Sequence, residues 1–417
     1  MTTHPSQTPV HHRHVLYVAG FDPQTARHYH ARYRAEAARQ EQISGVGVLV
    51  GPRQTDEDGY AFWILTTEEQ SQTVHTRYTF MDWGDIVRAH WPGDWWRVWW
   101  TGLLANLVMV RCGVLRRMLH AAWPPVLACF APLAALLLAL TVSAVLGMAA
   151  WAAHGLHLHA GWTAAMFGLI VLALSVAGHR LVKHIGVIWL IRSVRFNALF
   201  VRGEVPQLAL RTTAHALKLR KMLGTLPQAP ASELLLVGHS SGATVAVSML
   251  AEALREDPDL GSRGPQVSLL TLGQCMPLLG CFPQAVAFRR DLATVAQGRD
   301  LDWIDFSAPP DASCFPLTDP IRACGVEVQS RPPDRPKLLS PQFANMCTPE
   351  GYWKLKRNRL RMHFQYLNAS ELPVAYDYFQ ITAGRRTLGS RFAAQVSVNG
   401  FTRLLIWKSV PPPHADV

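Results

Sequence analysis

The sequence is poor in charged side chains, and the charges it has are unevenly spread. Only 17% of its 417 residues are Asp, Glu, Lys or Arg, below the roughly one quarter that is usual in globular proteins. With 49% hydrophobic residues, this composition excludes an intrinsically disordered chain. The formal net charge is +11, which indicates an anionic partner, either nucleic acid or a phospholipid surface.

The chain also lacks the motifs of a metalloprotein or a disulfide-rich protein. Its seven cysteines are an odd number, and no two of them form a Cys-x-x-Cys pair. We therefore expect free thiols in a reducing compartment, with neither a disulfide framework nor a zinc site. No P-loop, HExxH or helix-opening GxGxxG motif is present, so no cofactor and no metal are expected.

The N-terminal segment has no apolar run of the kind that a signal peptide needs, so no secretory signal is expected there. Residues 1–13 predict a polar, disordered tail. Four histidines in or next to this tail could instead bind a metal, which is the alternative interpretation. They are His4, His11, His12 and His14.

Residues 118–179 contain no charged side chain at all, and this absence predicts a membrane hairpin within 121–185. Two runs, 126–151 and 162–182, reach the length of about 20 residues that an α-helix needs to cross a bilayer. A buried helical hairpin is the alternative. Arg and Lys flank both runs, whereas the short loop between them has neither. The positive-inside rule therefore places both chain ends, with the parts of the chain on either side of the hairpin, in the cytoplasm, as in an inner-membrane protein, with the loop outside.

Tryptophans are concentrated just before this hairpin, in the segment 91–120. Because Trp prefers the headgroup level of a membrane, the segment predicts an interfacial helix on the cytoplasmic leaflet, with a packed aromatic core as the alternative. Positive charge beside a bilayer favours anionic lipid heads. We therefore expect the lipid bilayer as a partner and no nucleic acid, for which no recognition motif is visible. The oligomeric state stays open.

Outside the hairpin, strand-type and helix-type patterns alternate, which predicts an α/β fold with a mostly parallel sheet flanked by helices. The first part, 14–90, is expected to hold a strand at 14–20, a helix that starts at Asp22 and Pro23, and up to three further strands. The main part, 196–410, is expected to hold helices at 206–223 and 242–254 and buried strands at 233–238, 266–273 and 301–308. Residues 411–417 form a short Pro-rich tail.

The segment Gly238-His239-Ser240-Ser241-Gly242 stands between a predicted strand and a predicted helix. GxSxG in this setting is the pattern of a nucleophile elbow, in which a tight turn exposes the serine at the end of a sheet. Such a turn leaves no room for side chains at the two glycines. The N-terminus of the following helix can stabilise an oxyanion. An ordinary glycine-rich turn is the alternative.

With this motif and the earlier segment VLYVAGFDP, the chain resembles the α/β-hydrolase family of serine esterases and lipases. The resemblance covers residues 14–42 and 230–370, and the membrane hairpin is inserted between these two parts. It implies Ser240 as the nucleophile, followed along the chain by an acid and then a histidine. It also implies an oxyanion hole at the backbone N–H groups of Ser241 and Phe21, although the HGGG form of that loop is absent.

The base and the acid must lie after the nucleophile. His363 is the preferred base, since His414 lies in the Pro-rich tail. Asp311 follows the strand at 301–308 and is the preferred acid, with Asp305 second. The other candidate acids are Asp302 and Asp319.

The sequence thus predicts a membrane-anchored serine hydrolase that cleaves an ester or thioester, with a lipid or acyl-chain substrate favoured by its location. A catalytically inactive scaffold that binds lipid or a partner is the main alternative, and a small transporter or channel subunit is another. A basic run at 354–361, just before His363, fits phospholipid heads, an acidic substrate or a solvated face.

Overall fold

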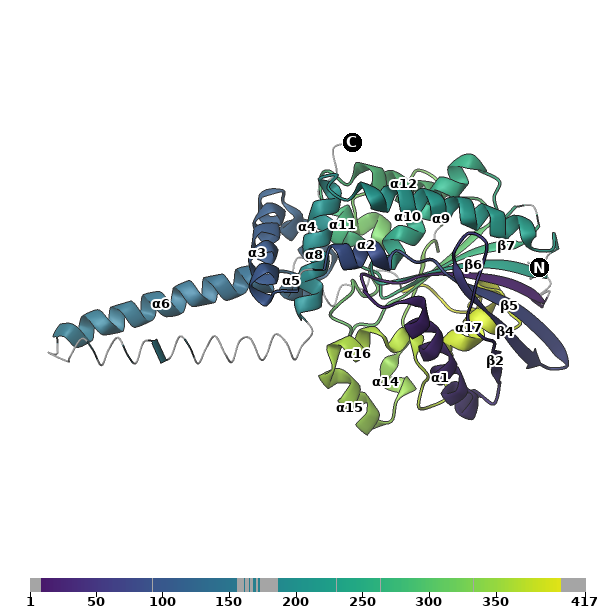
Figure 1. Ribbon diagram of the computed structural model, residues 1–417, viewed down its shortest axis with the longest axis horizontal. Helices are drawn as coiled ribbons and strands as arrows, with labels where there is room; N and C mark the ends of the chain where they lie inside the picture. The colour runs from purple at the N-terminus through teal and green to yellow at the C-terminus, as the bar shows by residue number, and fades with distance from the viewer. Residues whose placement is uncertain are drawn as a thin grey trace.

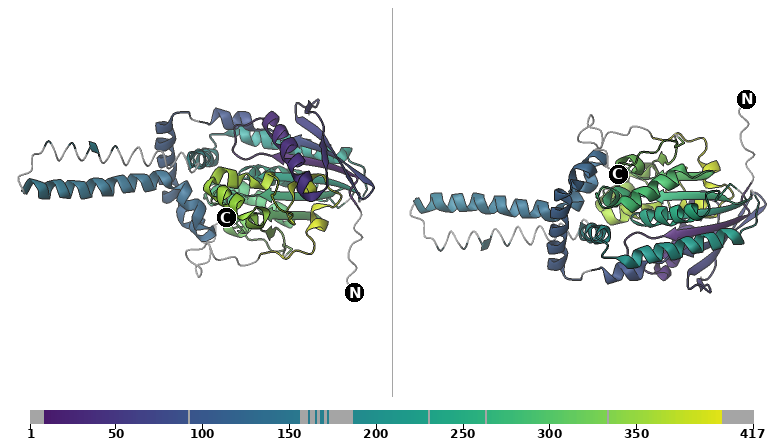
Figure 2. Two further views of the ribbon diagram at one scale, coloured as in Figure 1. Left: turned by 90° about the horizontal axis from the view of Figure 1, so that it is seen from below. Right: turned by 90° about the horizontal axis from the view of Figure 1, so that it is seen from above.

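A central sheet flanked by helices forms the body of the protein, and helix α6 projects away from it (Figures 1 and 2). The computed structural model describes residues 9–398, except 92, 156–160, 162–164, 166, 167, 170, 171, 173–186, 230, 263 and 333. The fold is mixed α/β with a mostly parallel sheet, as the alternation of patterns predicts.

The sheet of the described chain has nine strands, in the order β2-β4-β5-β1-β6-β7-β8-β9, with β3 beside β4. Six of them run parallel: β1 (His12–Val18), β5 (Gln72–Phe80), β6 (Ser232–His239), β7 (Gln266–Leu272), β8 (Leu301–Phe306) and β9 (Lys337–Leu339). The antiparallel end consists of β2 (Val48–Val50), β3 (Gln54–Thr55) and β4 (Ala61–Glu69).

Every residue of β6 is buried, because the strand is central and helices cover both faces of the sheet. On one face lie α9 (Pro206–Thr225), α10 (Gly242–Glu256) and α12 (Val286–Gln297). On the other lie α1 (Ala26–Ser44) and α17 (Tyr378–Ala383). The predicted start of α1 is wrong: the helix begins at Ala26, and the Asp22 carboxylate accepts hydrogen bonds from the Gln24 N–H and the Tyr29 hydroxyl instead.

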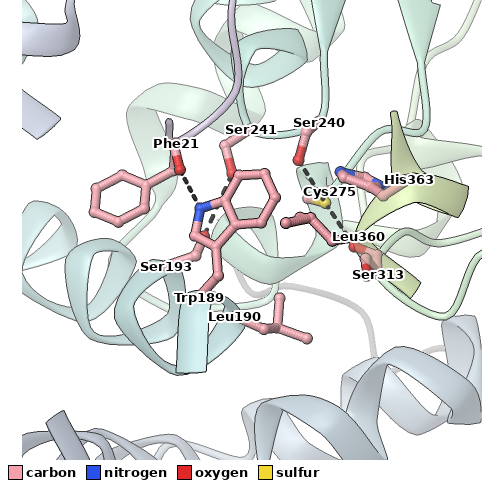
Figure 3. A pocket seen from close by; sticks show the side chains of 10 residues that line it. All are labelled: Phe21, Trp189, Leu190, Ser193, Ser240, Ser241, Cys275, Ser313, Leu360 and His363. Atoms are coloured by element: carbon pink, nitrogen blue, oxygen red, sulfur yellow. Dashed lines mark hydrogen bonds between the residues drawn. The ribbon is translucent and has the colours of Figure 1, made fainter. Parts of the chain in front are cut away.

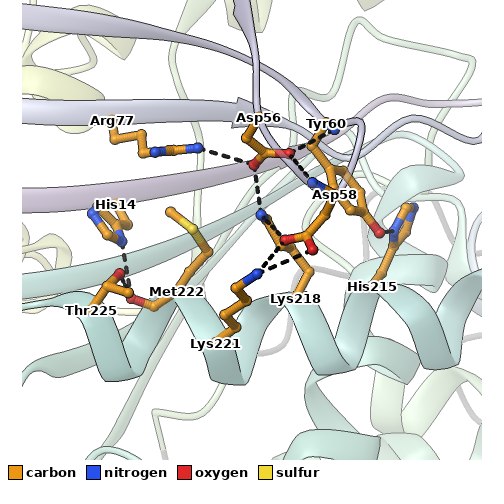
Figure 4. A network of polar contacts seen from close by, with 10 residues as sticks. All are labelled: His14, Asp56, Asp58, Tyr60, Arg77, His215, Lys218, Lys221, Met222 and Thr225. Atoms are coloured by element: carbon orange, nitrogen blue, oxygen red, sulfur yellow. Dashed lines mark hydrogen bonds and ion pairs between the residues drawn. The ribbon is translucent and has the colours of Figure 1, made fainter.

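An ion-pair network fastens the antiparallel end of the sheet to α9 (Figure 4). The ammonium of the nearly buried Lys218 lies 2.6 Å from Asp56 and 2.7 Å from Asp58, and Arg77 lies 3.0 Å from Asp56. Hydrogen bonds from Lys218 and Lys221 lower the pKa of Asp58 to about 2. Strand β3 and the turn after it are therefore held against α9 by these ion pairs.

Four consecutive helices lead from the body into the projection. They are α3 (Trp95–Arg111), α4 (Val114–Ala121), α5 (Trp123–Cys129) and α6 (Ala131–Gly155). Within the described chain, α6 is long and apolar enough to cross a membrane over Ala131–Ala149. Helices α3 and α4 pass the same test only as a pair bent by 85°.

The first predicted span starts too early, because the helix is interrupted at Phe130, between α5 and α6. Val126, Cys129 and Phe130 are buried in the body, so the helix able to cross a bilayer begins only at Ala131. Most of the second predicted run, 162–182, lies outside the described residues, and so does half of the loop before it.

Helix α3 has two unlike sides. Val98 and Met109 are buried, and α3 packs against α8 (Val187–Val201), the helix that follows the hairpin segment. The opposite side carries large exposed hydrophobic residues spaced three or four positions apart, which places them on one face of the helix. These are Trp96, Trp100, Leu104, Leu107 and Val110.

Candidate active site

Four segments that follow parallel strands converge at one edge of the sheet (Figure 3). Phe21 comes after β1, Ser240 after β6, Cys275 after β7 and Asp311 after β8. Phe21, Ser240 and Cys275 line one cavity together with His363. The carboxyl ends of parallel strands are the usual place for a site in an open α/β sheet.

Ser240 occupies a strained turn between β6 and α10. Its φ is +57°, a left-handed conformation that costs a non-glycine residue energy and is often found at functional sites. A Cβ atom on Gly238 would lie 2.6 Å from Cα of Ala243, and one on Gly242 would lie 2.3 Å from the carbonyl oxygen of Val18. Only glycine fits at both positions, which is the physical reason for the spacing of the motif.

His363 and Asp311 form a buried pair beside this turn. His363 is the last residue of α16 (Arg359–His363), and its Nδ1 lies 2.7 Å from Oδ2 of Asp311. The Asp311 carboxylate also accepts hydrogen bonds from the Tyr366 hydroxyl at 3.1 Å and from the Ser313 N–H at 3.0 Å. Burial alone would raise the pKa of Asp311, but His363 and the hydrogen bond from the Ser313 N–H hold it below its ordinary value. A carboxylate held in this way fixes the tautomer of the imidazole with Nδ1 protonated.

The other candidate acids lie elsewhere. Asp305 points into the core, where its carboxyl accepts hydrogen bonds from Thr271 at 2.6 Å and Ser307 at 2.8 Å, and burial raises its pKa to about 7. Asp319 caps the short helix α13 (Pro320–Ala323). Asp302, in β8, forms no hydrogen bond with His363 in the described structure. His414 lies outside the described residues.

The Ser240 hydroxyl rests against a thiol. Its Oγ lies 3.6 Å from Sγ of Cys275, and the ring of His363 lies beside it (Figure 3). The described structure has no hydrogen bond between Ser240 and His363. Such bonds are often long in unliganded enzymes and tighten when substrate binds. Burial raises the pKa of Cys275 to about 12, so this neighbour is a neutral thiol at physiological pH.

Within the described part of the chain, the backbone N–H groups of Phe21 and Ser241 donate to no backbone carbonyl, and both residues line the cavity that holds Ser240. The loop after β1 passes very close to Ser240, because a Cβ on Gly20 would lie 2.9 Å from Cβ of the serine. Donors placed in this way are suited to hold a negatively charged oxygen.

Trp189 of α8 closes the cavity. Its indole N–H donates a hydrogen bond to the carbonyl oxygen of Phe21, and its ring stacks on Phe364 at 5.5 Å between centroids. The ring also meets that of His363 edge-on at 6.1 Å. The volume of the cavity is about 30 Å³, room for little more than a water molecule.

His239, the second residue of the GxSxG motif, packs against His363. Its Nε2–H donates a hydrogen bond to the carbonyl oxygen of His363 at 3.0 Å, and the two rings are 4.9 Å apart. Burial lowers the pKa of His239 to about 3, so it is neutral at physiological pH and adds no charge to the site.

Sequence reasoning missed Trp189, Cys275 and Tyr366 as parts of the site. No local motif marks them, because each reaches the site only through tertiary packing. The described residues hold no group of three or more His, Cys, Asp or Glu side chains placed to bind a metal ion. Comparisons with family models, curated proteins and solved structures found no match to this chain. What the protein does must therefore be argued from the site itself.

Proposed function

We propose that the protein is a membrane-anchored serine hydrolase of the α/β-hydrolase type that cleaves an ester or thioester. One observation carries this proposal: Ser240, on a strained turn, shares a cavity with His363, whose Nδ1 lies 2.7 Å from the buried carboxylate of Asp311. A serine needs a base to become a nucleophile, and the base needs an acid to fix its tautomer.

In the proposed reaction the Ser240 oxygen attacks the carbonyl carbon of the substrate and Nε2 of His363 takes the hydroxyl proton. Asp311 stabilises the imidazolium, and the N–H groups of Phe21 and Ser241 hold the oxyanion. His363 then gives its proton to the leaving alcohol or thiol, which leaves an acyl group on Ser240. Water, deprotonated by His363, attacks this acyl-enzyme and releases the carboxylic acid.

We propose that α6 inserts in the bilayer and that the exposed apolar face of α3 lies on its surface. In support, α6 meets the length and polarity requirements of a span, and α3 exposes Trp96 and Trp100 beside Leu104 and Leu107. Under the positive-inside rule, the cationic flanks of the hairpin favour a body and both chain ends in the cytoplasm. A site next to the bilayer favours an acyl-chain ester as substrate.

A hydrolase-like scaffold without activity, which binds a lipid or a partner, is the second candidate. It is favoured by the contact of the Ser240 hydroxyl with Cys275 in place of His363 and by the small volume of the cavity, about 30 Å³.

The test is fluorophosphonate labelling of membranes that contain the full-length protein. We expect Ser240→Ala to abolish labelling, and His363→Ala and Asp311→Asn to slow it by about 10³- to 10⁴-fold, because each removes part of the machinery that activates the serine. Asp305→Asn is the matched control: this aspartate is equally buried in the same region but contacts only hydroxyl groups, so its variant should label at nearly the wild-type rate.

Absence of labelling in well-folded wild-type protein, together with no hydrolysis of acyl esters, would reject the hydrolase and support the scaffold. Labelling that persists in Ser240→Ala would place the reactive group elsewhere. Equal losses in Asp311→Asn and Asp305→Asn would contradict the role proposed for Asp311.

A further inference from the structure

The base of the proposed triad stands at the end of a strongly cationic pair of helices. Helices α15 (Pro349–Arg357) and α16 (Arg359–His363) follow one another with only Asn358 between them, and we call them the basic arm. The arm carries five cations, Lys354, Lys356, Arg357, Arg359 and Arg361. Lys354 pairs with Glu350 at 2.7 Å. The other four are exposed and have no carboxylate partner among the described residues.

Large apolar side chains are exposed among these cations. Trp353 is 56% exposed and Leu360 is 43% exposed, and the guanidinium of Arg357 lies 4.2 Å from the centre of the Trp353 ring. Aromatic and aliphatic side chains interleaved with Arg and Lys match the chemistry of a bilayer surface, where apolar groups reach the acyl boundary and cations meet phosphate.

The position of the arm fits the same partner. Helices α15 and α16 lie on the side of the body from which α6 projects, in yellow-green in Figures 1 and 2. Leu360 lines the cavity that holds Ser240. The arm therefore connects the side of the protein nearest the proposed span to the mouth of the candidate active site.

We propose that the basic arm binds the anionic headgroups of phospholipids in the membrane that anchors α6. This inference rests on the proposed membrane anchorage and not on the proposed hydrolysis. Four cations without carboxylate partners give the arm the charge complementarity that an anionic leaflet needs, each contributing about fivefold to association. Binding there seats Leu360 at the lipid surface and holds His363, in the same short helix, at the cavity.

The experiment uses the full-length protein in lipid nanodiscs and measures hydrogen exchange of the amides of residues 349–363. Nanodiscs of phosphatidylcholine are compared with nanodiscs that also contain phosphatidylglycerol. We expect exchange to slow by at least about fivefold in the anionic nanodiscs at low salt and to return toward the phosphatidylcholine value at high salt, because salt screens the attraction.

Two matched double variants distinguish an effect of the cations in the arm from an effect of the net charge of the protein. Lys356→Gln with Arg359→Gln removes two cations of the arm and should abolish most of the lipid-dependent slowing. Arg53→Gln with Arg290→Gln removes two exposed cations elsewhere on the body and should leave the slowing intact.

Equal exchange in the two kinds of nanodisc, or equal slowing in both double variants, would overturn the inference. A further arm of the experiment adds inorganic phosphate to phosphatidylcholine nanodiscs. Slowing by phosphate alone would show a site for a free anion and would also overturn it. Because no readout depends on Ser240, a negative result here leaves the hydrolase to be judged by its own labelling test, and a failed labelling test leaves this one intact.

Discussion

At the residue scale, two aspartates close together in the chain have opposite environments. Asp311 accepts hydrogen bonds from His363, Tyr366 and the Ser313 N–H, and its pKa lies below the ordinary value. Asp305 accepts hydrogen bonds from two hydroxyl groups in the buried core, and burial raises its pKa to about 7. His363, which can carry a positive charge, lies beside Asp311, and its presence favours the ionised form of that carboxyl.

Asp305 predicts a pH-dependent stability. Burial raises the pKa of this carboxyl in the folded chain from the ordinary 3.8 to about 7. Between these two pH values the folded state binds more protons than the unfolded state, so the free energy of unfolding falls as the pH rises. Asp305→Asn removes this contribution. We expect the variant, compared with the wild type, to gain more than about 2 °C in unfolding temperature between pH 4 and pH 8.

Thermal unfolding of the purified chain at both pH values measures this gain. Asp334→Asn, at an exposed position, is the control and should show no such dependence. An unchanged difference between Asp305→Asn and wild type across the pH range would contradict the prediction.

At the element scale, the central strands and helices follow from local patterns. The buried apolar runs at 233–238 and 266–273 become β6 and β7, and the helix expected at 206–223 becomes α9. Errors arise at element ends, where tertiary contacts compete with local signals. Asp22 and Pro23 look like a helix start, yet the Asp22 carboxylate is held by Tyr29 and α1 begins only at Ala26.

The contact between β1 and the elbow predicts a large effect at Gly242. A Cβ there would lie 2.3 Å from the carbonyl oxygen of Val18, so backbone must move to accept it. We expect Gly242→Ala to lower the free energy of unfolding by about 3 kcal/mol or more and to slow fluorophosphonate labelling.

Denaturant unfolding measures this effect. The control is Gly224→Ala in α9, where no atom lies within 4 Å of the added methyl group and where the higher helix propensity of alanine should add about 0.5 to 1 kcal/mol. Similar stabilities for the two variants would show that the elbow is not tightly packed.

At the scale of the whole molecule, α6 projects from the body with its apolar side chains exposed, and only 6% of its most hydrophobic window is buried. A soluble protein rarely exposes an apolar surface of this extent. The shape is explained if the bilayer supplies the missing partner of α6.

This account predicts that charges in α6 release the protein from membranes. Leu138→Arg with Val145→Arg, both at exposed positions of α6, should cost about 2.5 to 3.5 kcal/mol of insertion energy per arginine. A much larger fraction of the chain should then be extracted by alkaline carbonate. Leu210→Arg with Leu217→Arg, equally exposed hydrophobic positions on α9, is the control and should remain in the membrane pellet. Equal extraction of both double variants would contradict the assignment of α6.

The sequence by itself determined the features that depend on neighbouring residues. Apolar runs and turn residues set the α/β class and the parallel centre of the sheet, and the charge-free stretch placed the apolar helix. The glycines of the GxSxG turn follow from steric contacts within one strand-to-helix connection, so a short motif was enough to locate Ser240.

Only the tertiary structure decided what lies around that serine. It placed His363 against Asp311, the acid that the sequence favoured by its position after the strand, and it left Asp305 in the core. It also brought Trp189 from beyond the hairpin over the cavity and Cys275 beside the serine hydroxyl. Such contacts join residues far apart in the chain, and they depend on how whole elements pack, which local sequence patterns do not encode.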